Sequence, residues 1–350
     1  MIWIRADANS EIGMGHMMRC LSIAQELDRL GKQVCFLLAD EAPASFLLER
    51  KQKFHVLHTD YRKMEQELPV LLPLLQEKMQ SLVLFDSYFV TQRYLKEIAG
   101  YARTVYLDDK NMFSYPVDAV INYNIYGKPS EYGKDSFRPG RMLLTGPAYA
   151  PLRKEFQGIP YIVRDRAENI LITTGGSDQY FLAGKILEAA LAACELAGQR
   201  FLQFHVVSGA FNQNLPRLLA LSERYSNVHI HRNVTEMAKL MQACDIAVTA
   251  GGSTMYELCA VGVPMICFSF VDNQERIVET FAERGLVCYG GNFLKEKETM
   301  AETAARSLIR LVQDKEARAS YSRRERELVD GFGAGRIAEA LCRMENGELA

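Results

Sequence analysis

The feature that most constrains the fold of this chain is a unit found at the start of each half: a short apolar strand, a glycine turn and an amphipathic helix. In the first half the strand at residues 2–4 leads through a polar turn to Gly13-Met14-Gly15-His16. In the second half the strand at residues 169–174 runs into Gly175-Gly176-Ser177-Asp178. Strands that alternate with helices predict a parallel sheet covered on both faces. Each half is therefore predicted to build its own sheet.

Continuous apolar runs mark the other strands, because a strand buried on both faces is apolar along its length. The runs lie at residues 34–38, 81–86, 104–109, 119–122, 141–144, 201–207, 228–231, 245–249 and 264–268. We predict an α/β fold of two doubly wound, Rossmann-like domains that face a cleft. The boundary is placed in the polar join after Arg153, which gives an N-terminal domain of residues 1–155 and a C-terminal domain of residues 156–350. The last helices are expected to pack back on the N-terminal domain.

Composition excludes several classes of function. A net charge of -2 over 350 residues provides no strong field for nucleic acid. No window approaches the roughly 18 apolar residues of a membrane span, and the N-terminus lacks the pattern of a signal peptide. We therefore expect a cytoplasmic protein that binds no nucleic acid and makes no stable membrane insertion. The eight dispersed cysteines form no C-x-x-C pair and predict buried free thiols rather than a metal site.

The Gly13-Met14-Gly15-His16 segment is a candidate active site. Glycine lets the backbone approach a ligand closely, and a helix start offers unpaired N–H groups that attract anions. An imidazole at that junction lies where an α/β fold normally holds its ligand. The structural alternative is a histidine that bonds only to nearby backbone. His205, His229 and His231 lie on predicted strands and are interpreted as structural.

A second glycine turn, Gly251-Gly252-Ser253-Thr254, lies between an apolar strand and a helix that carries Glu257. Its amides and hydroxyls suit a phosphate, and the carboxylate can accept hydrogen bonds from a ribose diol. The turn matches neither a P-loop nor a dinucleotide fingerprint. The alternative is a helix capped by Ser253, with Thr254 and Glu257 in a capping box. The turn at Gly175 favours the phosphate site, since two such turns can converge on one ligand.

Motifs spread over about the first 290 residues form a recognisable set. They are Arg5-Ala6-Asp7, Ile12-Gly13-Met14-Gly15-His16, Arg19-Cys20-Leu21, Asp86-Ser87-Tyr88, Asp108-Asp109, Asn122-Tyr123-Asn124, residues 146–153, Thr174-Gly175-Gly176-Ser177-Asp178, residues 251–257 and Asp272-Asn273-Gln274. Together they resemble the nucleotide-sugar hydrolases of the pseudaminic acid pathway and the related spore coat polysaccharide biosynthesis proteins.

This resemblance implies the two-domain glycosyltransferase B fold. It also implies hydrolysis of UDP-2,4-diacetamido-2,4,6-trideoxy-β-L-altropyranose to UDP and the free sugar, with water as acceptor and without metal or cofactor. The family's catalytic histidine and active-site tyrosine correspond to His16 and Tyr88, and its nucleotide-binding segment to residues 251–257. The chain departs from the pattern at Ser87, where the altrose-type hydrolases carry histidine, and at Tyr256, where asparagine is expected. Both departures bear on which sugar is bound.

Under this interpretation His16 is the general base on the attacking water, with inversion at the anomeric carbon. Tyr88 positions water or substrate, and Asp7 orients the imidazole or contacts the sugar. Amides of the second glycine turn hold the charge that develops on UDP. The residues expected to bind substrate or nucleotide are Gly13, Gly15, Arg19, Arg153, Gly175, Gly176, Ser177, Gly251, Gly252, Ser253, Thr254, Glu257, Asn273 and Gln274.

Two other functions compete with hydrolysis. A glycosyltransferase of the same fold would move the sugar from UDP to an acceptor, and its chemistry differs only in the nucleophile. A nucleotide-sugar-binding protein would hold the same ligand without turnover. Release of UDP in the absence of an acceptor distinguishes the hydrolase from both.

Overall fold

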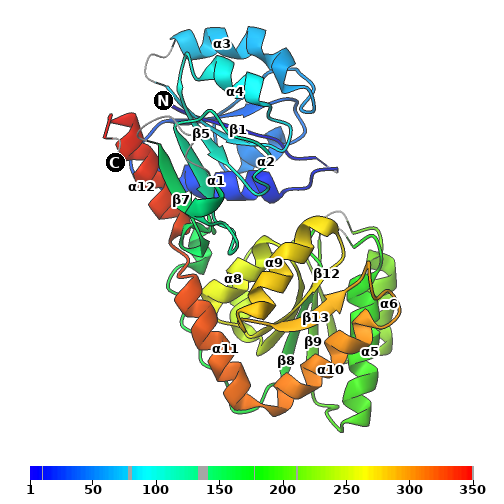
Figure 1. Cartoon of the computed structure of the whole chain (residues 1–350). Coiled ribbons are helices and arrows are strands. Elements are labelled where there is room, and N and C mark those ends of the chain that lie inside the picture. The colour runs from blue at the N-terminus through cyan, green and yellow to red at the C-terminus, as the bar shows by residue number, and fades with distance from the viewer. Residues whose placement is uncertain (10, 78–80, 133–140, 177, 210–211, 349–350) are drawn as a thin grey trace. The chain divides into compact units, whose positions relative to one another are not determined.

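The computed structural model describes residues 1–9, 11–77, 81–132, 141–176, 178–209 and 212–348. The chain divides into two compact units: unit 1 comprises Met1–Arg153 with Phe332–Ala350, and unit 2 comprises Lys154–Gly331. Each unit is built on a parallel sheet with helices around it (Figure 1). No helix in the described part of the chain is both long and apolar enough to span a bilayer.

Unit 1 holds a seven-stranded parallel sheet in the order β3-β2-β1-β4-β5-β6-β7. Its strands are β1 (Ile2–Ala6), β2 (Val34–Leu38), β3 (Phe54–Val56), β4 (Leu82–Asp86), β5 (Arg103–Leu107), β6 (Ala119–Asn122) and β7 (Met142–Thr145). Its α-helices are α1 (Gly15–Arg29), α2 (Ala44–Glu49), α3 (Leu68–Glu77), α4 (Gln92–Ile98) and α12 (Gly333–Glu345). The final helix α12 packs on α1, and the terminal amine of Met1 pairs with Glu345 at 3.0 Å.

Unit 2 holds a six-stranded parallel sheet in the order β10-β9-β8-β11-β12-β13. Its strands are β8 (Asn169–Thr173), β9 (Gln203–Ser208), β10 (Val228–Arg232), β11 (Ile246–Ala250), β12 (Met265–Ser269) and β13 (Cys288–Asn292). Its helices are α5 (Leu182–Leu196), α6 (Leu215–Arg224), α7 (Met237–Ala243), α8 (Ser253–Val261), α9 (Asp272–Glu283), α10 (Met300–Gln313) and α11 (Lys315–Leu328). The predicted α/β class with a parallel sheet in each half is confirmed.

Two strands were not predicted from the sequence, and both lie at a sheet edge. The residues of β3 are half-buried or exposed, and β13 has the sequence Cys-Tyr-Gly-Gly-Asn. Neither strand carries the continuous apolar run by which the other strands, including the edge strands β7 and β10, were predicted. The central strands β1, β4, β11 and β12 are buried at every residue.

The chain order reverses beside the first strand of each sheet. In unit 1 β1 pairs with both β2 and β4, and Ala6 lies opposite Asp86. In unit 2 β8 pairs with both β9 and β11, and Thr173 lies opposite Thr249. Loops that leave the two strands at such a switch point diverge and leave a crevice at the carboxyl ends of the strands. The predicted glycine turns follow β1, β8 and β11, so they lie at these switch points.

Three histidines share one face of the sheet near the edge of unit 2. His205 on β9 lies opposite His229 on β10, and its Nδ1 lies 3.0 Å from Nε2 of His231. Its Nε2 lies 3.1 Å from Oδ1 of Asn169. Burial, followed by the neighbouring histidines, lowers the pKa of His205 to about 4, and the pKa of His231 is lowered in the same way. The geometry agrees with the structural interpretation of these residues.

We predict that this cluster makes unit 2 sensitive to mild acid. His205 stays neutral in the folded state down to about pH 4, whereas the unfolded chain protonates it near pH 6.5. The unfolded state therefore binds more protons, and the free energy of unfolding falls as the pH drops from about 6.5 towards 4. Urea unfolding of the wild type and His205→Asn between pH 7.5 and 4.5 should show a shallower decline in the variant. The exposed His58 supplies the control His58→Asn, and identical slopes in the wild type and His205→Asn would contradict the prediction.

Candidate functional site

The loop between β1 and α1 folds around the side chain of Asn9. Its Oδ1 accepts the N–H groups of Glu11 at 2.9 Å and Ile12 at 3.0 Å, and its carbonyl accepts the N–H of Gly13 at 2.9 Å. Gly13 has a φ of +72°, a conformation that an L side chain rarely adopts. Because α1 begins at Gly15, this loop places His16 in the first turn of the helix, where its side chain is 90% buried.

His16 and Asp86 form a hydrogen-bonded pair at the switch point of unit 1. Nδ1 of His16 lies 2.6 Å from Oδ1 of Asp86, the last residue of β4. Nη2 of Arg19 lies 3.1 Å from the same nitrogen, but it donates to Asp86 at 2.5 Å, and the nearer, ionised carboxylate only accepts hydrogen bonds, so we assign the ring proton to Nδ1. That tautomer leaves Nε2 with a lone pair, the arrangement in which a carboxylate orients a histidine to act as a base.

Arg19, one turn further along α1, fixes Asp86 from the other side. Its Nε donates to Oδ2 of Asp86 at 2.6 Å and its Nη2 to Oδ1 at 2.5 Å. Burial by itself raises the pKa of Asp86, but the charge of Arg19 and the hydrogen bonds from Arg19 and His16 outweigh it and hold the pKa well below its usual range. Nη1 of Arg19 donates to Asp109 and to the hydroxyl of Tyr123, both at 2.9 Å. These protein partners hold Arg19 beside the imidazole, and its contact with substrate stays a prediction.

Tyr88 completes the network. Its ring meets the imidazole of His16 edge to face, with 4.6 Å between centroids, and its hydroxyl donates to Oδ2 of Asp109 at 2.8 Å. Burial, followed by the charge of Asp109, raises the pKa of Tyr88 well above its ordinary value. The hydroxyl therefore stays protonated and remains a donor. Asp109 is the second residue after β5, so its carboxylate lies near the carboxyl end of the neighbouring β4.

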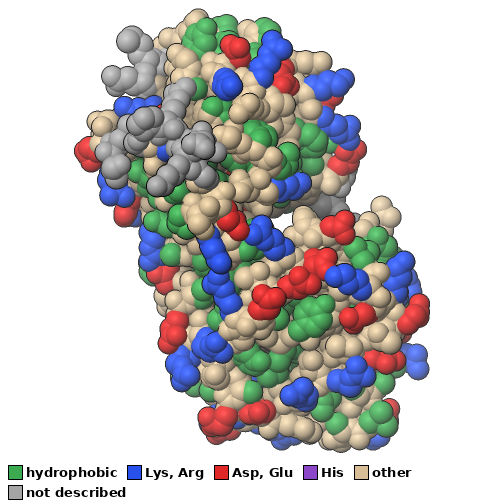
Figure 2. Space-filling model, viewed as in Figure 1, with side chains coloured by type: hydrophobic (Ala, Val, Ile, Leu, Met, Phe, Trp, Pro, Cys, Tyr) green, Lys and Arg blue, Asp and Glu red, His purple; other side chains and the backbone are tan. Residues whose placement is uncertain are grey.

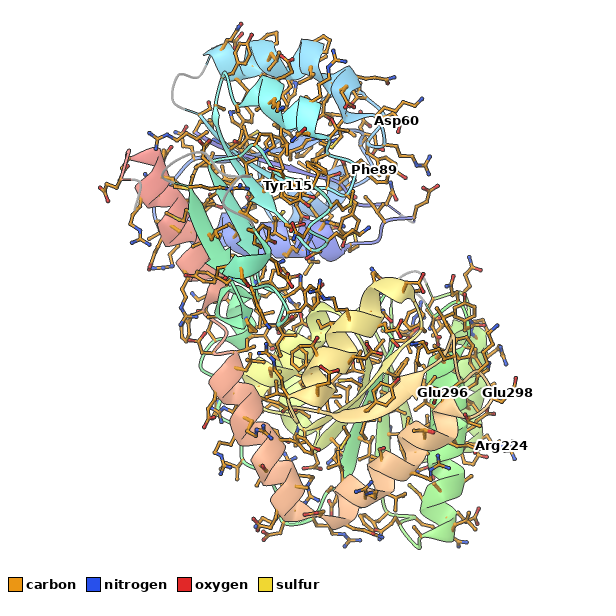
Figure 3. All side chains as sticks on the ribbon, viewed as in Figure 1. Asp60, Phe89, Tyr115, Arg224, Glu296 and Glu298 are labelled. Atoms are coloured by element: carbon orange, nitrogen blue, oxygen red, sulfur yellow. The ribbon has the colours of Figure 1, made fainter. Side chains whose placement is uncertain are left out.

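One pocket of unit 1 brings the three predicted catalytic residues together. Asp7, His16 and Tyr88 line it, along with Asp86 and Ser87. Its other wall is more apolar and includes Tyr61 and Phe89, whose rings meet edge to face at 5.4 Å. Phe89, labelled in Figure 3, lies in the loop after β4. On the viewed surface, basic and acidic side chains are interspersed (Figure 2). The ionisable side chains that line the pocket, by contrast, include buried ones: Asp7, His16 and Asp86.

One of the two alternatives expected for Asp7 is wrong, and the other, contact with the sugar, stays a prediction. Asp7 does not orient the imidazole, because that hydrogen bond belongs to Asp86. Instead Oδ1 of Asp7 accepts the N–H of Ala39 at 2.8 Å and Oδ2 accepts a hydrogen bond from Arg5. The sequence shows that Asp86 ends a strand, but it does not show that β4 lies next to β1. It is this pairing of strands that makes Asp86 the hydrogen-bond partner of His16.

The second glycine turn stands at the N-terminus of α8 in unit 2. Gly252 is the N-cap residue and Ser253 is the first residue of the helix, so the alternative in which Ser253 caps the helix is wrong. First-turn N–H groups of a helix have no partner within the helix. Gly251 packs closely on α9: a Cβ there would lie 2.8 Å from Val278 Cγ2 and 3.1 Å from the carbonyl oxygen of Gln274. The turn and the first turn of α9, which carries Asn273 and Gln274, are therefore in contact.

The turn after β8 differs from this one, because its helix is already capped. The carboxylate of Asp178 accepts the N–H groups of Leu182 at 2.6 Å and Ala183 at 3.1 Å, which are the first residues of α5. An anion at the start of α5 would meet this carboxylate. In the described part of this turn the N–H of Gly175 donates to Oγ1 of Thr173 at 3.5 Å, which leaves the amide of Gly176 for a phosphate. Ser177 lies outside the described residues, and Arg153 is the last residue of the first segment of unit 1.

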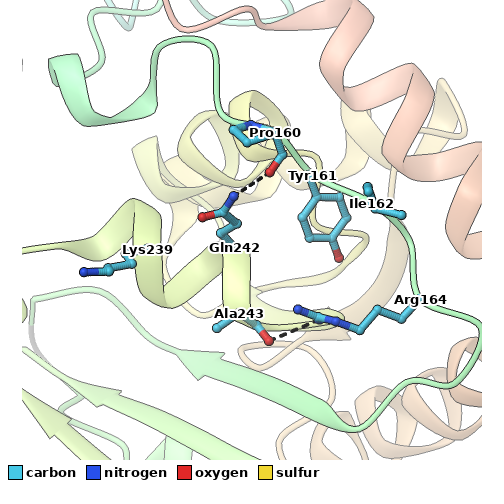
Figure 4. Close-up of a pocket in the computed structure, with 7 residues that line it drawn as sticks. All are labelled: Pro160, Tyr161, Ile162, Arg164, Lys239, Gln242 and Ala243. Carbon is cyan, nitrogen blue, oxygen red and sulfur yellow. Dashed lines mark hydrogen bonds between the residues drawn. The ribbon is translucent and has the colours of Figure 1, made fainter.

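A wider hollow on unit 2 has a structural explanation (Figure 4). Residues 159–164 cross α7 there. Nε2 of Gln242 donates to the carbonyl of Pro160 at 2.6 Å, and Arg164 donates to the carbonyl of Ala243 at 3.3 Å and to Asp245 Oδ1 at 2.6 Å. These bonds hold the segment to α7 and to the start of β11. The polar side chains of Gln242 and Arg164 that line the hollow therefore stabilise the fold.

Comparison with known proteins agrees with the fold and the motifs. Residues 169–334 match the glycosyltransferase family 28 C-terminal domain. The chain is 29% identical over 350 residues to the spore coat polysaccharide biosynthesis protein SpsG of Bacillus subtilis, with 97% of each chain covered. It is 23% identical over 288 residues to the UDP-2,4-diacetamido-2,4,6-trideoxy-beta-L-altropyranose hydrolase of Campylobacter jejuni, which covers 81% of this chain and 97% of the hydrolase. The crystal structure of MurG from Acinetobacter baumannii aligns over 98% of this chain and 99% of MurG with a TM-score of 0.65 and 14% identity.

These similarities show which proteins the chain resembles. The fold is of the glycosyltransferase B type, and the predicted resemblance is confirmed, since homologues of the chain include the spore coat protein and the altropyranose hydrolase. The domain match and the homologues make the chain similar to enzymes of the glycosyltransferase-like superfamily.

We predict that Gly251→Ala lowers the free energy of unfolding, because it pushes the glycine turn after β11 away from α9. The added methyl group would lie under 3 Å from Val278 Cγ2 and close to Gln274 backbone, which cannot move without displacing α9. Overpacking of this kind costs roughly 1–3 kcal/mol in free energy of unfolding, which urea titration measures. The matched control is Gly176→Ala, whose Cβ would meet nothing within 4 Å. Equal stability of the two variants would show that the contact with α9 does not matter.

Proposed function

We propose that the protein is a metal-independent nucleotide-sugar hydrolase that cleaves the anomeric C–O bond of a UDP-linked diacetamido-trideoxy sugar. The observation that carries this proposal is the His16–Asp86 pair in the pocket of unit 1. A base held in one tautomer by a buried carboxylate is suited to take a proton from water. In this mechanism Nε2 of His16 accepts that proton while the water oxygen attacks the anomeric carbon from the face opposite to UDP.

The leaving group needs a separate electrostatic partner. As the C–O bond breaks, its electron pair passes to the diphosphate of UDP, and the added charge is stabilised by N–H donors. The amides of Gly252, Ser253 and Thr254 at the start of α8 supply such donors with the positive end of the helix dipole. We propose that Glu257, Asn273 and Gln274 contact the nucleoside part of the substrate.

The names of the relatives support the substrate class. The Campylobacter jejuni homologue is an altropyranose hydrolase, and the Bacillus subtilis homologue is a spore coat polysaccharide biosynthesis protein. We propose a UDP-diacetamido sugar that supplies pseudaminic acid or a related surface glycan. Ser87 lines the pocket beside His16, where the altrose-type hydrolases carry histidine, so we place the selection among sugar stereoisomers at this residue.

The decisive experiment follows the oxygen of water. The protein is incubated with UDP-2,4-diacetamido-2,4,6-trideoxy-β-L-altropyranose in water enriched in oxygen-18, without an acceptor, and the products are analysed by mass spectrometry. Hydrolysis at the anomeric carbon predicts one labelled oxygen in the free sugar and none in UDP. Label in UDP would indicate attack at phosphorus. No release of UDP unless a sugar acceptor is added would indicate the transferase.

We predict that His16→Ala lowers kcat by roughly 10²–10⁴-fold, the usual contribution of a general base. Asp86→Asn should lose a comparable factor, because an amide at this position can donate to Nδ1 and stabilise the wrong tautomer. The affinity for UDP, measured by calorimetry, should remain within about threefold of the wild type, since neither residue faces the phosphate. Full activity of His16→Ala would remove the proposed base from the mechanism.

A further inference from the structure

A second buried ion network lies behind the pocket, and the mechanism above does not use it. Arg5 on β1 is fully buried, and its Nε lies 3.0 Å from both carboxylate oxygens of Glu67. Glu67 ends the short 3₁₀ helix Met64–Glu67, and the hydroxyl of Tyr94 on α4 donates to it. On its other side Nη1 of Arg5 donates to Oδ2 of Asp7 at 2.5 Å. The four side chains form one chain of contacts that ends in the pocket at Asp7.

The charges in this network do not cancel. Arg5 carries one positive charge, whereas Asp7 and Glu67 carry one negative charge each. Glu67 contacts Nε and Nη2 of Arg5, the latter at 2.9 Å, while Asp7 pairs with Nη1 at 2.5 Å, so two carboxylates share the guanidinium. A buried Arg5–Asp7 pair alone would have been neutral, and burial of a further charge is costly. Because Glu67 is present, the network as a whole keeps one net negative charge, and Asp7 is its member that lines the pocket.

We propose that Asp7 is a catalytic anion that stabilises the positive charge developing on the sugar ring, and that Arg5, Glu67 and Tyr94 are positioning residues that keep the network net negative. The inference rests on the proposed hydrolysis, since the transition state of glycosyl transfer to water resembles an oxocarbenium ion. Asp7 forms no covalent bond in this step. The electron pair of the broken C–O bond leaves with UDP, and the proton of the attacking water goes to His16.

The Arg19 network has the same composition, with one guanidinium shared by Asp86 and Asp109. Two arginines and four carboxylates therefore adjoin the pocket, and with Lys110, whose ammonium lies 4.0 Å from the centroid of the Tyr88 ring, one net negative charge remains. An anionic pocket opposes the binding of a diphosphate but favours a cationic ring carbon. The experiment below therefore measures how strongly the pocket prefers a cationic ligand to a neutral one.

The test compares a cationic with a neutral sugar mimic in the presence of UDP. The probes are 2-acetamido-1,2-dideoxynojirimycin, whose ring nitrogen is protonated at pH 6, and the 1,5-anhydro sugar with the same substituents. Calorimetry with the full chain should show at least tenfold tighter binding of the cationic probe to the wild type. Asp7→Asn should reduce this ratio to about one, and Glu67→Gln should reduce it to about threefold, because Arg5 then offsets the charge of Asp7. Glu65→Gln, on the same 3₁₀ helix but bonded to Thr91, is the matched control and should keep the wild-type ratio.

Turnover provides the second readout. Asp7→Asn should lower kcat by about 10²-fold and Glu67→Gln by about tenfold while KM changes little, as expected for an interaction made in the transition state. If Glu67→Gln does not fold, Asp7→Asn alone decides the outcome. A wild-type ratio near one, no binding of either probe, or an unchanged ratio in Asp7→Asn would overturn the proposal. A high ratio that depends on Asp7 without release of UDP would instead refute the proposed hydrolysis and leave the anionic pocket standing.

Discussion

The site of unit 1 depends on one carboxylate that is shared by two residues of one helix. Asp86 accepts hydrogen bonds from His16 and Arg19, which lie three residues apart on α1 and so project from the same side of the helix. The guanidinium keeps the carboxylate ionised in a buried position, and the ionised carboxylate fixes the tautomer of the imidazole. Without Arg19, burial would favour the protonated acid, which would lose its ability to orient the ring. Tyr88 and Asp109 close the same network from neighbouring loops.

The two units differ in electrostatic character in a way that suits the proposed reaction. In unit 1 the ionised groups around the pocket include more carboxylates than guanidinium groups. In unit 2 the start of α8 presents backbone N–H groups and the positive end of a helix dipole. Cleavage of a nucleotide sugar produces positive charge at the ring carbon and negative charge on the diphosphate. The carboxylates of unit 1 therefore suit the positive charge on the ring carbon, and the N–H groups of unit 2 suit the negative charge on the diphosphate.

The glycine turns of unit 2 look equivalent in sequence, but their surroundings differ. After β8 the helix begins with Asp178 bonded to its first amides, so an internal carboxylate occupies the place of an anionic ligand. After β11 the N-cap is Gly252, which has no side chain to block the first turn of α8. Gly251 next to it is required for packing, since α9 leaves no room for a Cβ. The turn after β11 therefore leaves the first amides of α8 without a side-chain cap, whereas in the turn after β8 Asp178 binds the first amides of α5.

The sequence by itself determined the α/β class, the central strands and the location of the glycine turns, because a strand buried on both faces and a turn with positive φ each restrict which residues can stand there. It also pointed to His16 and Tyr88. It missed β3 and β13, which carry no continuous apolar run. Of the two roles it offered for Asp7, Asp86 fills the orientation of the imidazole instead. Only the pairing of β1 with β4 brings Asp86 to His16 across 70 residues of chain, and only the contact with Glu67 gives the Arg5 network a net negative charge. Local patterns follow from short-range steric and burial preferences, whereas the partners of a buried charge are set by which strands become neighbours in the folded sheet.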